Sequence, residues 1–374
     1  MKNFVFLLLV IAISGALHAQ TTAEGWFSKG KSLKSDEKYK EAADAFKKAI
    51  ALKADYTEAL HQLGWCYNEL EMYNEALDAL KKEEKTNPDD KAANWQEIGY
   101  AYKGLKKYDD AIQYFNKAIA EDPEYALPYK ERGYAYYKKQ DYQKALVDFN
   151  KYVSLKEEIT DSDFYYDKAW CENELEKYDD AVTSLNKCVA LDETYADAYS
   201  ELGFSYFKLK RNDEALTSYR KANNLDKQKQ LGIIGIADVF YTNLKNYDSA
   251  IYYFEKATSF NKTNKSIYYK LGWCYNDKER YNDAVLVLKQ AVAIDKDYSL
   301  ALEELGYCLY KVKKYDEALI YLKQVINKDP KSELGRYYAG LCYSAKGNKT
   351  DLRKMYDELK SMNSSYANDL YKLL

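Results

Sequence analysis

One segment of the chain matches a phosphate-binding motif. Residues 25–32 are Gly-Trp-Phe-Ser-Lys-Gly-Lys-Ser and fit the pattern G-x4-G-K-S letter for letter. That pattern binds phosphate only as a loop between a strand and a helix, where backbone N–H groups surround the ligand. No strand pattern precedes residue 25, and Trp26, Gly30 and Leu33 share one helical face. We therefore expect a helix here, whose N–H groups are already bonded, and no nucleotide site.

Residues that could form other catalytic or metal sites are few. The chain has two histidines, His18 and His61, whereas the zinc sites of metalloenzymes combine several ligands. Several Ser-x2-Lys pairs, such as Ser28–Lys31, occur without the S-D-N and K-T-G motifs that penicillin-binding enzymes also need. Adjacent carboxylates such as Asp109-Asp110 stand where helices are expected to begin, and there they favour the helix dipole. The sequence predicts no catalytic residue, no metal site and no cofactor, and hence a protein that is not an enzyme.

The elements that must position any functional residue repeat along the chain. A glycine returns mostly every 34 or 35 residues, and we call it the key glycine; Ala169 and Asp238 take its place in two copies. A second small residue, usually alanine, follows twelve residues later. In residues 92–125 the two lie on separate helical stripes, and Lys106–Asp110 forms a break between them. Such a period predicts stacked helix-turn-helix units in which Gly99 and Ala111 mark a close approach of two helices. The key glycines are Gly30, Gly64, Gly99, Gly133, Gly203, Gly272, Gly306 and Gly340.

These columns resemble the tetratricopeptide repeat family, whose pattern is W-x2-L-G-x2-Y, then A-x3-F, then P. The resemblance covers nearly all of the chain after residue 22. It implies an all-α fold, a right-handed α-solenoid superhelix of about ten stacked repeats. We expect a solenoid over residues 20–364 and a short capping helix over 365–374. The expected repeats are 23–56, 57–90, 92–125, 126–159, 162–195, 196–229, 231–264, 265–298, 299–332 and 333–366.

The seventh repeat departs from the pattern. It has Gly232 and Gly235 in its first helix and Asp238 where the key glycine belongs. Because Asp238 would crowd the close contact between helices, we predict a local change in stacking angle. Ordinary decay of the repeat is the alternative, and it would leave the stack regular.

The first 19 residues resemble a secretory signal peptide rather than part of the repeats. Lys2 gives a positive start, Phe4–Ile13 is apolar, and Ser14–Ala19 is an exit of mostly small residues. Cleavage is expected after Ala19, with Ala16 as the alternative. No later apolar run approaches the roughly 18 residues that a membrane-spanning helix needs. We therefore expect an exported chain without a transmembrane span, located in the periplasm or, alternatively, secreted.

The charge distribution narrows the range of possible partners. The 56 Lys and Arg and 59 Asp and Glu residues are interspersed. Because no basic stripe is present in the sequence, nucleic acid is a poor candidate partner.

Five cysteines lie two residues after the key glycine or its substitute. Packed helices are about 8–10 Å apart, and a disulfide needs Cα atoms within about 7 Å, so no bridge is expected within this column. Cys171–Cys188 is the one pair that merits checking. The column contains Cys66, Cys171, Cys274, Cys308 and Cys342.

Aromatic residues follow most key glycines directly. The resemblance implies that this position faces the concave surface of the solenoid, where the residue three further on lies one turn along the same face. We call these two positions the groove columns. The trio Trp65, Asn68, Glu69 recurs three repeats later as Trp170, Asn173, Glu174 and again near Trp273 and Asn276. The groove candidates are Trp65, Asn68, Tyr100, Tyr134, Tyr137, Trp170, Asn173, Phe204, Phe207, Trp273, Asn276, Tyr307 and Tyr310.

Rings flanked by amides suit an extended peptide, because rings take side chains and Asn can bond a backbone amide twice. The sequence therefore predicts a scaffold that binds protein or peptide along the groove, in the cell envelope. A glycan-binding module using the same rings is the alternative. Two other possibilities stay open: the rings only fill the inside of the superhelix, or the convex face binds instead. Self-association is a further possibility.

Overall fold

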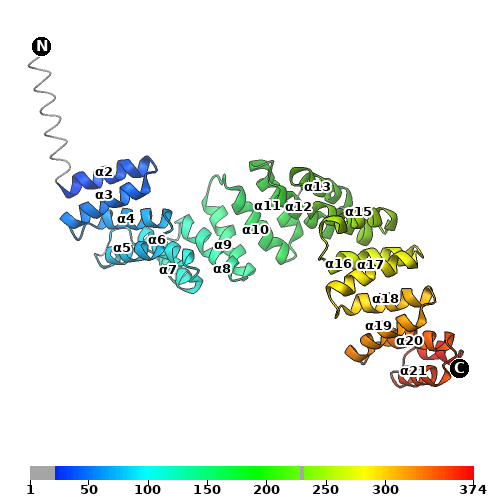
Figure 1. Cartoon of the computed structure of the whole chain (residues 1–374). Coiled ribbons are helices and arrows are strands. Elements are labelled where there is room, and N and C mark those ends of the chain that lie inside the picture. The colour runs from blue at the N-terminus through cyan, green and yellow to red at the C-terminus, as the bar shows by residue number, and fades with distance from the viewer. Residues whose placement is uncertain (1–21, 87, 228–230) are drawn as a thin grey trace, which may run out of the picture. The chain divides into compact units, whose positions relative to one another are not determined.

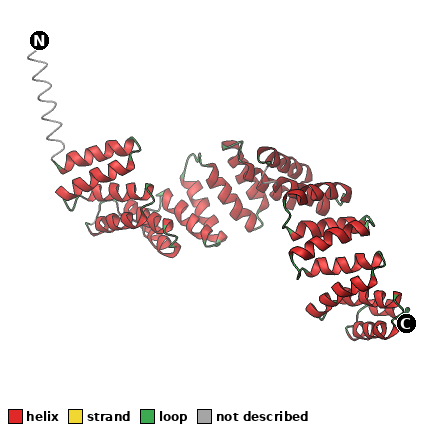
Figure 2. Cartoon of the chain, viewed as in Figure 1, coloured by secondary structure: helices red, strands yellow, loops and turns green. Residues whose placement is uncertain are grey.

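The computed structural model describes residues 22–86, 88–227 and 231–374, and the expected signal peptide, residues 1–19, lies outside them. The chain divides into two compact units, Met1–Lys177 and Tyr178–Leu374. We call them the N-terminal and C-terminal units. Throughout the described residues every regular element is a helix (Figure 2). The prediction of an all-α solenoid built from stacked helix pairs is confirmed.

From residue 22 on, the N-terminal unit contains four complete helix pairs and the first helix of a fifth (Figure 1). In each pair the even-numbered helix is the first and the odd-numbered helix the second. The helices are α2 (Ala23–Ser35), α3 (Tyr39–Leu52), α4 (Thr57–Glu69), α5 (Tyr73–Lys85), α6 (Lys91–Gly104), α7 (Tyr108–Glu121), α8 (Ala126–Lys138), α9 (Tyr142–Leu155) and α10 (Ser162–Glu174). First helices of neighbouring repeats contact each other, as α4 and α6 do, so they form one layer of the stack.

The C-terminal unit continues the same alternation. Its helices are α11 (Tyr178–Leu191), α12 (Ala196–Lys208), α13 (Asn212–Leu225), α14 (Leu231–Asp238), η1 (Val239–Asn243), α15 (Tyr247–Phe260), α16 (Lys265–Asp277), α17 (Tyr281–Ile294), α18 (Ser299–Lys311), α19 (Tyr315–Lys328), α20 (Glu333–Ala345), α21 (Lys349–Ser361) and α22 (Tyr366–Tyr371). The short α22 packs on α20 and α21. None of the helices in the described part of the chain is long and apolar enough to cross a membrane.

Every key glycine except Gly340 faces a large side chain of the second helix of its own repeat. A Cβ atom on Gly99 would lie 2.5 Å from a ring carbon of Phe115, and one on Gly64 would lie 2.4 Å from Cγ of Leu80. Ala111, on the second helix, is fully buried. The expectation that Gly99 and Ala111 are small because the helices meet there is confirmed. Any larger side chain at these positions would have to displace a buried ring or leucine.

The phosphate-binding pattern lies inside a helix, as expected. Residues 25–32 belong to α2, which Thr22 caps by accepting a hydrogen bond from the Gly25 N–H at 3.0 Å. The paired carboxylates Asp109-Asp110 and Asp179-Asp180 lie in the first turns of α7 and α11, where they face the positive end of the helix dipole.

A left-handed residue ends the first helix of every repeat. It lies seven positions after the key glycine or its substitute and has φ between 53° and 68°. In nine of the ten repeats it is not glycine; only the tenth has glycine, Gly347, with φ of 68°. Left-handed backbone disfavours side chains with a Cβ. The nine are Glu37, Glu71, Lys106, Gln140, Glu176, Lys210, Lys245, Glu279 and Lys313.

The seventh repeat contains a π-helix where its key glycine is missing. The π-helix η1 follows Asp238 directly, and the Leu244 N–H donates to the Val239 carbonyl five residues back. Ala237 is fully buried in the same cluster as Phe254, whereas the Asp238 carboxylate is 24% exposed and 2.6 Å from the Lys270 ammonium. The expectation that Asp238 crowds the helix contact is therefore wrong. Next to the π-turn, Ala237 is the buried residue, whereas the Asp238 carboxylate reaches Lys270 of the next repeat. The change in stacking angle stays a prediction.

All six cysteines are buried. The five that share the column after the key glycine are free thiols. Burial raises the pKa of Cys66 to about 11 and that of Cys171, Cys274 and Cys342 to about 12. These thiols act as small apolar residues of the core.

Candidate functional site

The aromatic residues of the groove columns lie on successive first helices and are half-buried. In the N-terminal unit these are Trp65 on α4, Tyr100 on α6, Tyr134 and Tyr137 on α8, and Trp170 on α10. In the C-terminal unit they are Phe204 and Phe207 on α12, Trp273 on α16, and Tyr307 and Tyr310 on α18. Half-burial means that each ring is packed on one side and open to solvent on another. Their assignment to ligand binding remains a prediction.

A tyrosine from the preceding repeat supports several of these rings. Tyr39 meets Trp65 edge-on with ring centroids 5.5 Å apart, and Tyr247 meets Trp273 in the same way at 5.3 Å. The pairs Tyr178–Phe204 and Tyr281–Tyr307 repeat this arrangement. Each supporting tyrosine begins a second helix, so the regular period of the chain fixes the contact. Edge-to-face packing is favourable for aromatic pairs and holds the groove ring in one orientation.

Lysine side chains cover part of the ring surface. The Lys34 ammonium lies 3.6 Å from the centroid of Trp65, and the Lys103 ammonium lies 4.5 Å from that of Tyr100. In the C-terminal unit Lys208 and Lys311 lie over Phe204 and Tyr307 at 5.4 and 5.8 Å. These cations are attracted by the negative ring faces. The surface beside the rings is therefore a mixture of apolar and charged groups.

A row of polar contacts joins the first helices of neighbouring repeats, and we call it the inter-repeat ladder. Each contact runs from the residue four after one key glycine to the residue two before the next. The Lys34 ammonium donates to Gln62 at 2.7 Å, and the Asn68 amide donates to the Glu97 carboxylate at 2.7 Å. Lys103–Glu131 and Asn276–Glu304 are the equivalent pairs further along. The ladder residues therefore lie on the same first helices as the groove rings, before and after the ring that follows each key glycine.

Two of the predicted ligand-binding amides belong to this ladder. Asn68 is 2% exposed, and its amide also donates to the Glu97 backbone carbonyl at 3.1 Å. Its side-chain oxygen is buried and has no partner among the described residues. The expectation that Asn68 offers its amide to a bound peptide is therefore wrong for this arrangement, because its donors already join two repeats. Asn276 is half-buried and bonded to Glu304, and Asn173 is buried.

Burial makes the ladder electrostatically sensitive. It raises the pKa of Glu97, against the opposing effect of the hydrogen bond from Asn68. Burial likewise raises the pKa of Glu304, and the bond from Asn276 again opposes the shift. In the seventh repeat Asp238 replaces the usual ladder residue and bonds Lys270 of the eighth. A charge that lost its partner here would be left in a poorly solvated place.

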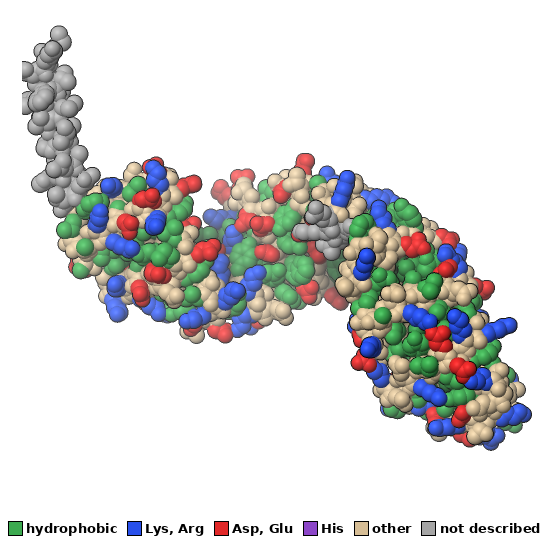
Figure 3. Space-filling model, in the orientation of Figure 1, with side chains coloured by type: hydrophobic (Ala, Val, Ile, Leu, Met, Phe, Trp, Pro, Cys, Tyr) green, Lys and Arg blue, Asp and Glu red, His purple; other side chains and the backbone are tan. Residues whose placement is uncertain are grey.

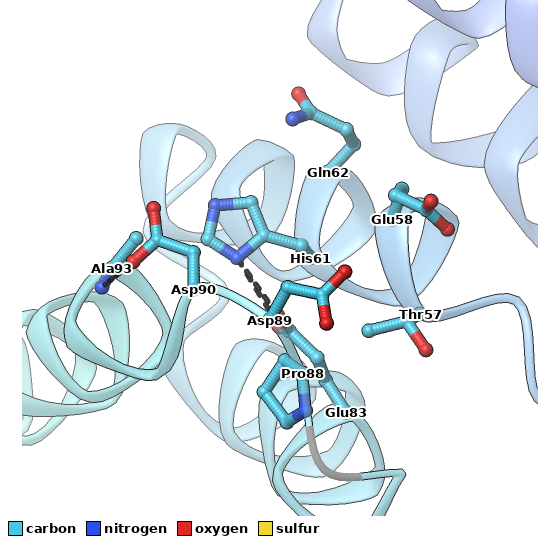
Figure 4. A pocket seen from close by; sticks show the side chains of 9 residues that line it. All are labelled: Thr57, Glu58, His61, Gln62, Glu83, Pro88, Asp89, Asp90 and Ala93. Carbon is cyan, nitrogen blue, oxygen red and sulfur yellow. Dashed lines mark hydrogen bonds and ion pairs between the residues drawn. The ribbon is translucent and has the colours of Figure 1, made fainter.

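A pocket of about 430 Å³ lies between α4 and the start of α6. Glu58, His61 and Gln62 of α4 line it, together with Glu83 of α5 and the residues Asp89 and Asp90 before α6 (Figure 4). The His61 ring nitrogen Nδ1 lies 3.2 Å from both carboxylate oxygens of Glu83, whose Oε2 also accepts a hydrogen bond from Asn94 at 2.7 Å. Burial disfavours the charged imidazole, but the contact with Glu83 outweighs it and raises the pKa of His61.

The sequence could have revealed the ladder but not the pocket. Ladder residues recur two positions before the key glycine as Gln62, Glu97, Glu131 and Glu304, so a survey of that column would have found them. The pocket depends on His61 and Asn94, which have no counterpart in the other repeats. A residue that occurs once leaves no periodic signal.

Comparison with known families agrees with the geometry of the stack. Models described as "Tetratricopeptide repeat" match residues 33–96, 92–125, 129–159 and 196–229, and one described as "TPR repeat" matches 172–210. The chain is a tetratricopeptide repeat protein. A model described as "Anaphase-promoting complex, cyclosome, subunit 3" matches residues 243–325 of this tetratricopeptide repeat protein. Arrays of such repeats are in general protein-binding scaffolds rather than enzymes.

The curated relatives match only part of this tetratricopeptide repeat protein. Heat shock protein STI1 of Saccharomyces cerevisiae is 31% identical over 153 residues, which is 40% of this chain and 20% of that protein. Small glutamine-rich tetratricopeptide repeat-containing protein 2 of the same yeast is 30% identical over 67 residues, 18% of this chain and 19% of that protein. The matched segments thus span about a fifth of each relative.

Solved structures resemble this tetratricopeptide repeat protein at lower identity. The C-terminal part of a TPR repeat-containing protein from Cytophaga hutchinsonii is 19% identical with a TM-score of 0.47, covering 75% of this chain and 99% of that one. YrrB, described as a TPR protein with an unusual peptide-binding site, is 20% identical with a TM-score of 0.39, covering 60% of this chain and 97% of that one.

Proposed function

We propose that this protein is a non-enzymatic scaffold that binds an extended protein or peptide segment on the rings of its first helices. The observation that carries this proposal is the fixed, half-open state of the rings. Trp65 and Trp273 are each packed edge-on by a tyrosine of the preceding repeat and are half-buried. A rigid aromatic surface loses little conformational entropy when it binds a ligand.

Peptide side chains fit this surface better than sugar rings do. A sugar would stack flat on a ring face, and at Trp65 the ammonium of Lys34 lies 3.6 Å above the ring. A peptide can instead place apolar side chains beside the ring edges while its carbonyl groups meet the lysines. We therefore favour peptide over glycan as the ligand.

The test is a selection of random twelve-residue peptides displayed on phage against the full chain. Trp65→Ala, Trp170→Ala and Trp273→Ala together should abolish binding of the selected peptides. The matched control replaces three exposed rings outside the groove columns, Tyr252, Phe260 and Tyr371, and should keep binding. Helix content measured by circular dichroism verifies that both variants fold. Selected peptides that bind equally to the tryptophan variant would exclude the groove and direct attention to the convex face.

We also propose that the chain acts in the cell envelope after export. The support is the sequence of residues 1–19, with Lys2, the apolar run Phe4–Ile13 and the exit Ser14–Ala19. Expression of the chain with its own N-terminus in a bacterium with two membranes should yield a periplasmic protein. Its N-terminus should be Gln20, or Leu17 if cleavage follows Ala16. A cytoplasmic product that keeps residues 1–19 would refute export.

A further inference from the structure

The pocket beside His61 has two carboxylates without partners at its mouth. Glu58 and Asp89 line the pocket and are exposed. Among the described residues neither makes an ion pair or a side-chain hydrogen bond. Figure 4 shows them from opposite elements, Glu58 on α4 and Asp89 in the segment before α6. Two unpaired carboxylates that line one cavity make it favourable for a cation.

The floor of the pocket is already satisfied and fixes its shape. Glu83 is 2% exposed and is bonded by both His61 and Asn94. Asp90 uses one oxygen to cap α6, accepting the Ala93 N–H at 2.9 Å. The inner groups therefore hold the walls in place, and the outer carboxylates are left for a ligand.

The lysine that bonds a residue of the pocket is engaged on both sides. Lys34 of α2 donates to Gln62 at the edge of the pocket and covers the ring of Trp65. No Lys or Arg lines the pocket itself. Four carboxylates thus line the pocket and, among the described residues, the His61 ring is its only basic lining group, so the site attracts a positive group.

The size and the donor set favour an organic cation over a metal ion. A volume of about 430 Å³ falls within the range of about 300–1,000 Å³ that is usual for ligand pockets. In the described part of the chain no three His, Cys, Asp or Glu side chains are arranged to hold a metal ion. A guanidinium or ammonium on a long side chain fits both facts, because such a chain fills space and its charge bonds separated carboxylates.

We propose that this pocket binds a lysine or arginine side chain of the peptide that lies on the groove, with Glu58 and Asp89 as its ionic partners. The pocket adjoins the first groove tryptophan, because Lys34 contacts both Gln62 of the pocket and Trp65. This inference rests on the proposed peptide-binding function and adds the chemistry of the partner. The recognised segment combines apolar residues with a basic residue at one end.

The first test uses the peptides selected on the full chain. They should contain an excess of lysine or arginine, and replacing that residue by its neutral isostere citrulline or acetyl-lysine should weaken binding roughly tenfold. Glu58→Gln with Asp89→Asn should produce the same loss for the basic peptide and little change for its neutral isostere. The matched control, Glu121→Gln with Glu157→Gln, removes two exposed carboxylates of the same unit and should bind like the unaltered chain.

A second measurement reports on the pocket without any selected peptide. N-acetyl-arginine amide, titrated at millimolar concentration, should shift the NMR resonances of the His61 ring, and N-acetyl-citrulline amide should not. The shift should disappear in the Glu58→Gln, Asp89→Asn variant and persist in the control variant.

The outcomes separate this inference from the proposed function. Peptides that need the three tryptophans but show no basic preference would overturn the pocket assignment and leave the groove function intact. An unchanged affinity in the Glu58→Gln, Asp89→Asn variant would do the same. Binding that ignores the tryptophans, together with an arginine-dependent shift at His61, would refute the groove function while retaining the pocket as a cation site.

Discussion

The side-chain amide of Asn68 donates to the carboxylate of Glu97 in the next repeat at 2.7 Å. The same amide donates to the Glu97 backbone carbonyl at 3.1 Å. A residue that stands in a binding column therefore joins one repeat to the next. In an array whose stability comes from contacts between neighbours, such a bond contributes to the fold of two repeats at once.

Removing the acceptor of this bond should weaken the N-terminal unit. We expect Glu97→Ala to lower the free energy of unfolding by about 1–3 kcal/mol, because the buried Asn68 amide loses its side-chain acceptor and keeps only its bond to the backbone carbonyl of residue 97. Glu97→Gln keeps an acceptor oxygen and should lose less. Urea unfolding followed by circular dichroism measures both. Equal stability of Glu97→Ala and the unaltered chain would mean that the ladder is not a stabilising element.

The pair His61–Glu83 should stabilise the fold in a pH-dependent way. The contact raises the pKa of His61 in the folded state, so its stabilisation is complete below the unfolded pKa of about 6.5 and is lost as the pH rises through the folded pKa. His61→Gln should therefore destabilise the protein more at acidic than at alkaline pH. Thermal unfolding of both chains between about pH 5.5 and 8.5 tests this. A stability difference that stays constant with pH would contradict the assignment.

The cysteines that follow the key glycines should be inert in the native protein. Burial raises the pKa of Cys274 and Cys342 to about 12, and the thiolate is the reactive form. Iodoacetamide at neutral pH should leave Cys66, Cys171, Cys274, Cys308 and Cys342 unmodified, and urea should make all of them reactive. Mass spectrometry of the labelled peptides gives the answer. Fast native labelling at any of these positions would show that its repeat opens readily.

Asp238 offers a direct test of the π-helix. If Asp238 crowded the helix contact, Asp238→Gly would relieve it and stabilise the protein. Because Ala237 is buried there and Asp238 bonds Lys270 instead, we expect Asp238→Gly to destabilise the C-terminal unit by about 1–3 kcal/mol. Urea unfolding distinguishes the two signs. Asp238→Asn, which retains a polar partner for Lys270, should lie between Asp238→Gly and the unaltered chain.

Introducing glycine at one left-handed turn and removing it from another should change stability in opposite directions. Lys313→Gly should raise the free energy of unfolding by roughly 0.5–1 kcal/mol, because glycine adopts φ of 63° without a Cβ penalty. Gly347→Lys should lower it by a similar amount, and no atom lies within 4 Å of the Cβ it would add, so backbone strain alone is measured. A destabilising Lys313→Gly would show that the Lys313 side chain contributes more than the strain.

The fold was predictable because its determinants are periodic. Gly99 and Ala111 mark a helix contact, and the same pair recurs at fixed spacing, so one correct interpretation extends along the chain. The register of the seventh repeat was not predictable. Counting back seven residues from the left-handed Lys245 places Asp238 at the key position. The π-turn between Asp238 and Lys245 adds one residue to the helix, and the sequence gives no sign of it. Periodicity locates positions along a sequence and assumes that every turn has the same width.

The candidate site was predictable only in its outline. The column of rings lies on successive first helices, but several of the rings have neighbours from the preceding repeat. Nothing in the sequence around Asn68 shows that Glu97 takes its donors, since the two are 29 residues apart. The pocket at His61 likewise depends on Glu83 and Asn94, which belong to different helices. Side-chain pairing across repeats requires coordinates.

The left-handed residue at the end of each first helix also contributes to the stability of its own repeat. The stability of a stacked array is approximately a sum of repeat and interface contributions. Glycine adopts the left-handed turn at Gly347 without a Cβ penalty, whereas Glu71 carries that penalty; we expect the turn alone to make the second repeat open more easily than a glycine there would. The residue types at these ten equivalent turns can therefore make hydrogen exchange and protease sensitivity differ from one repeat to the next. Exchanging residues at these turns would direct where the chain frays without altering any ring of the groove.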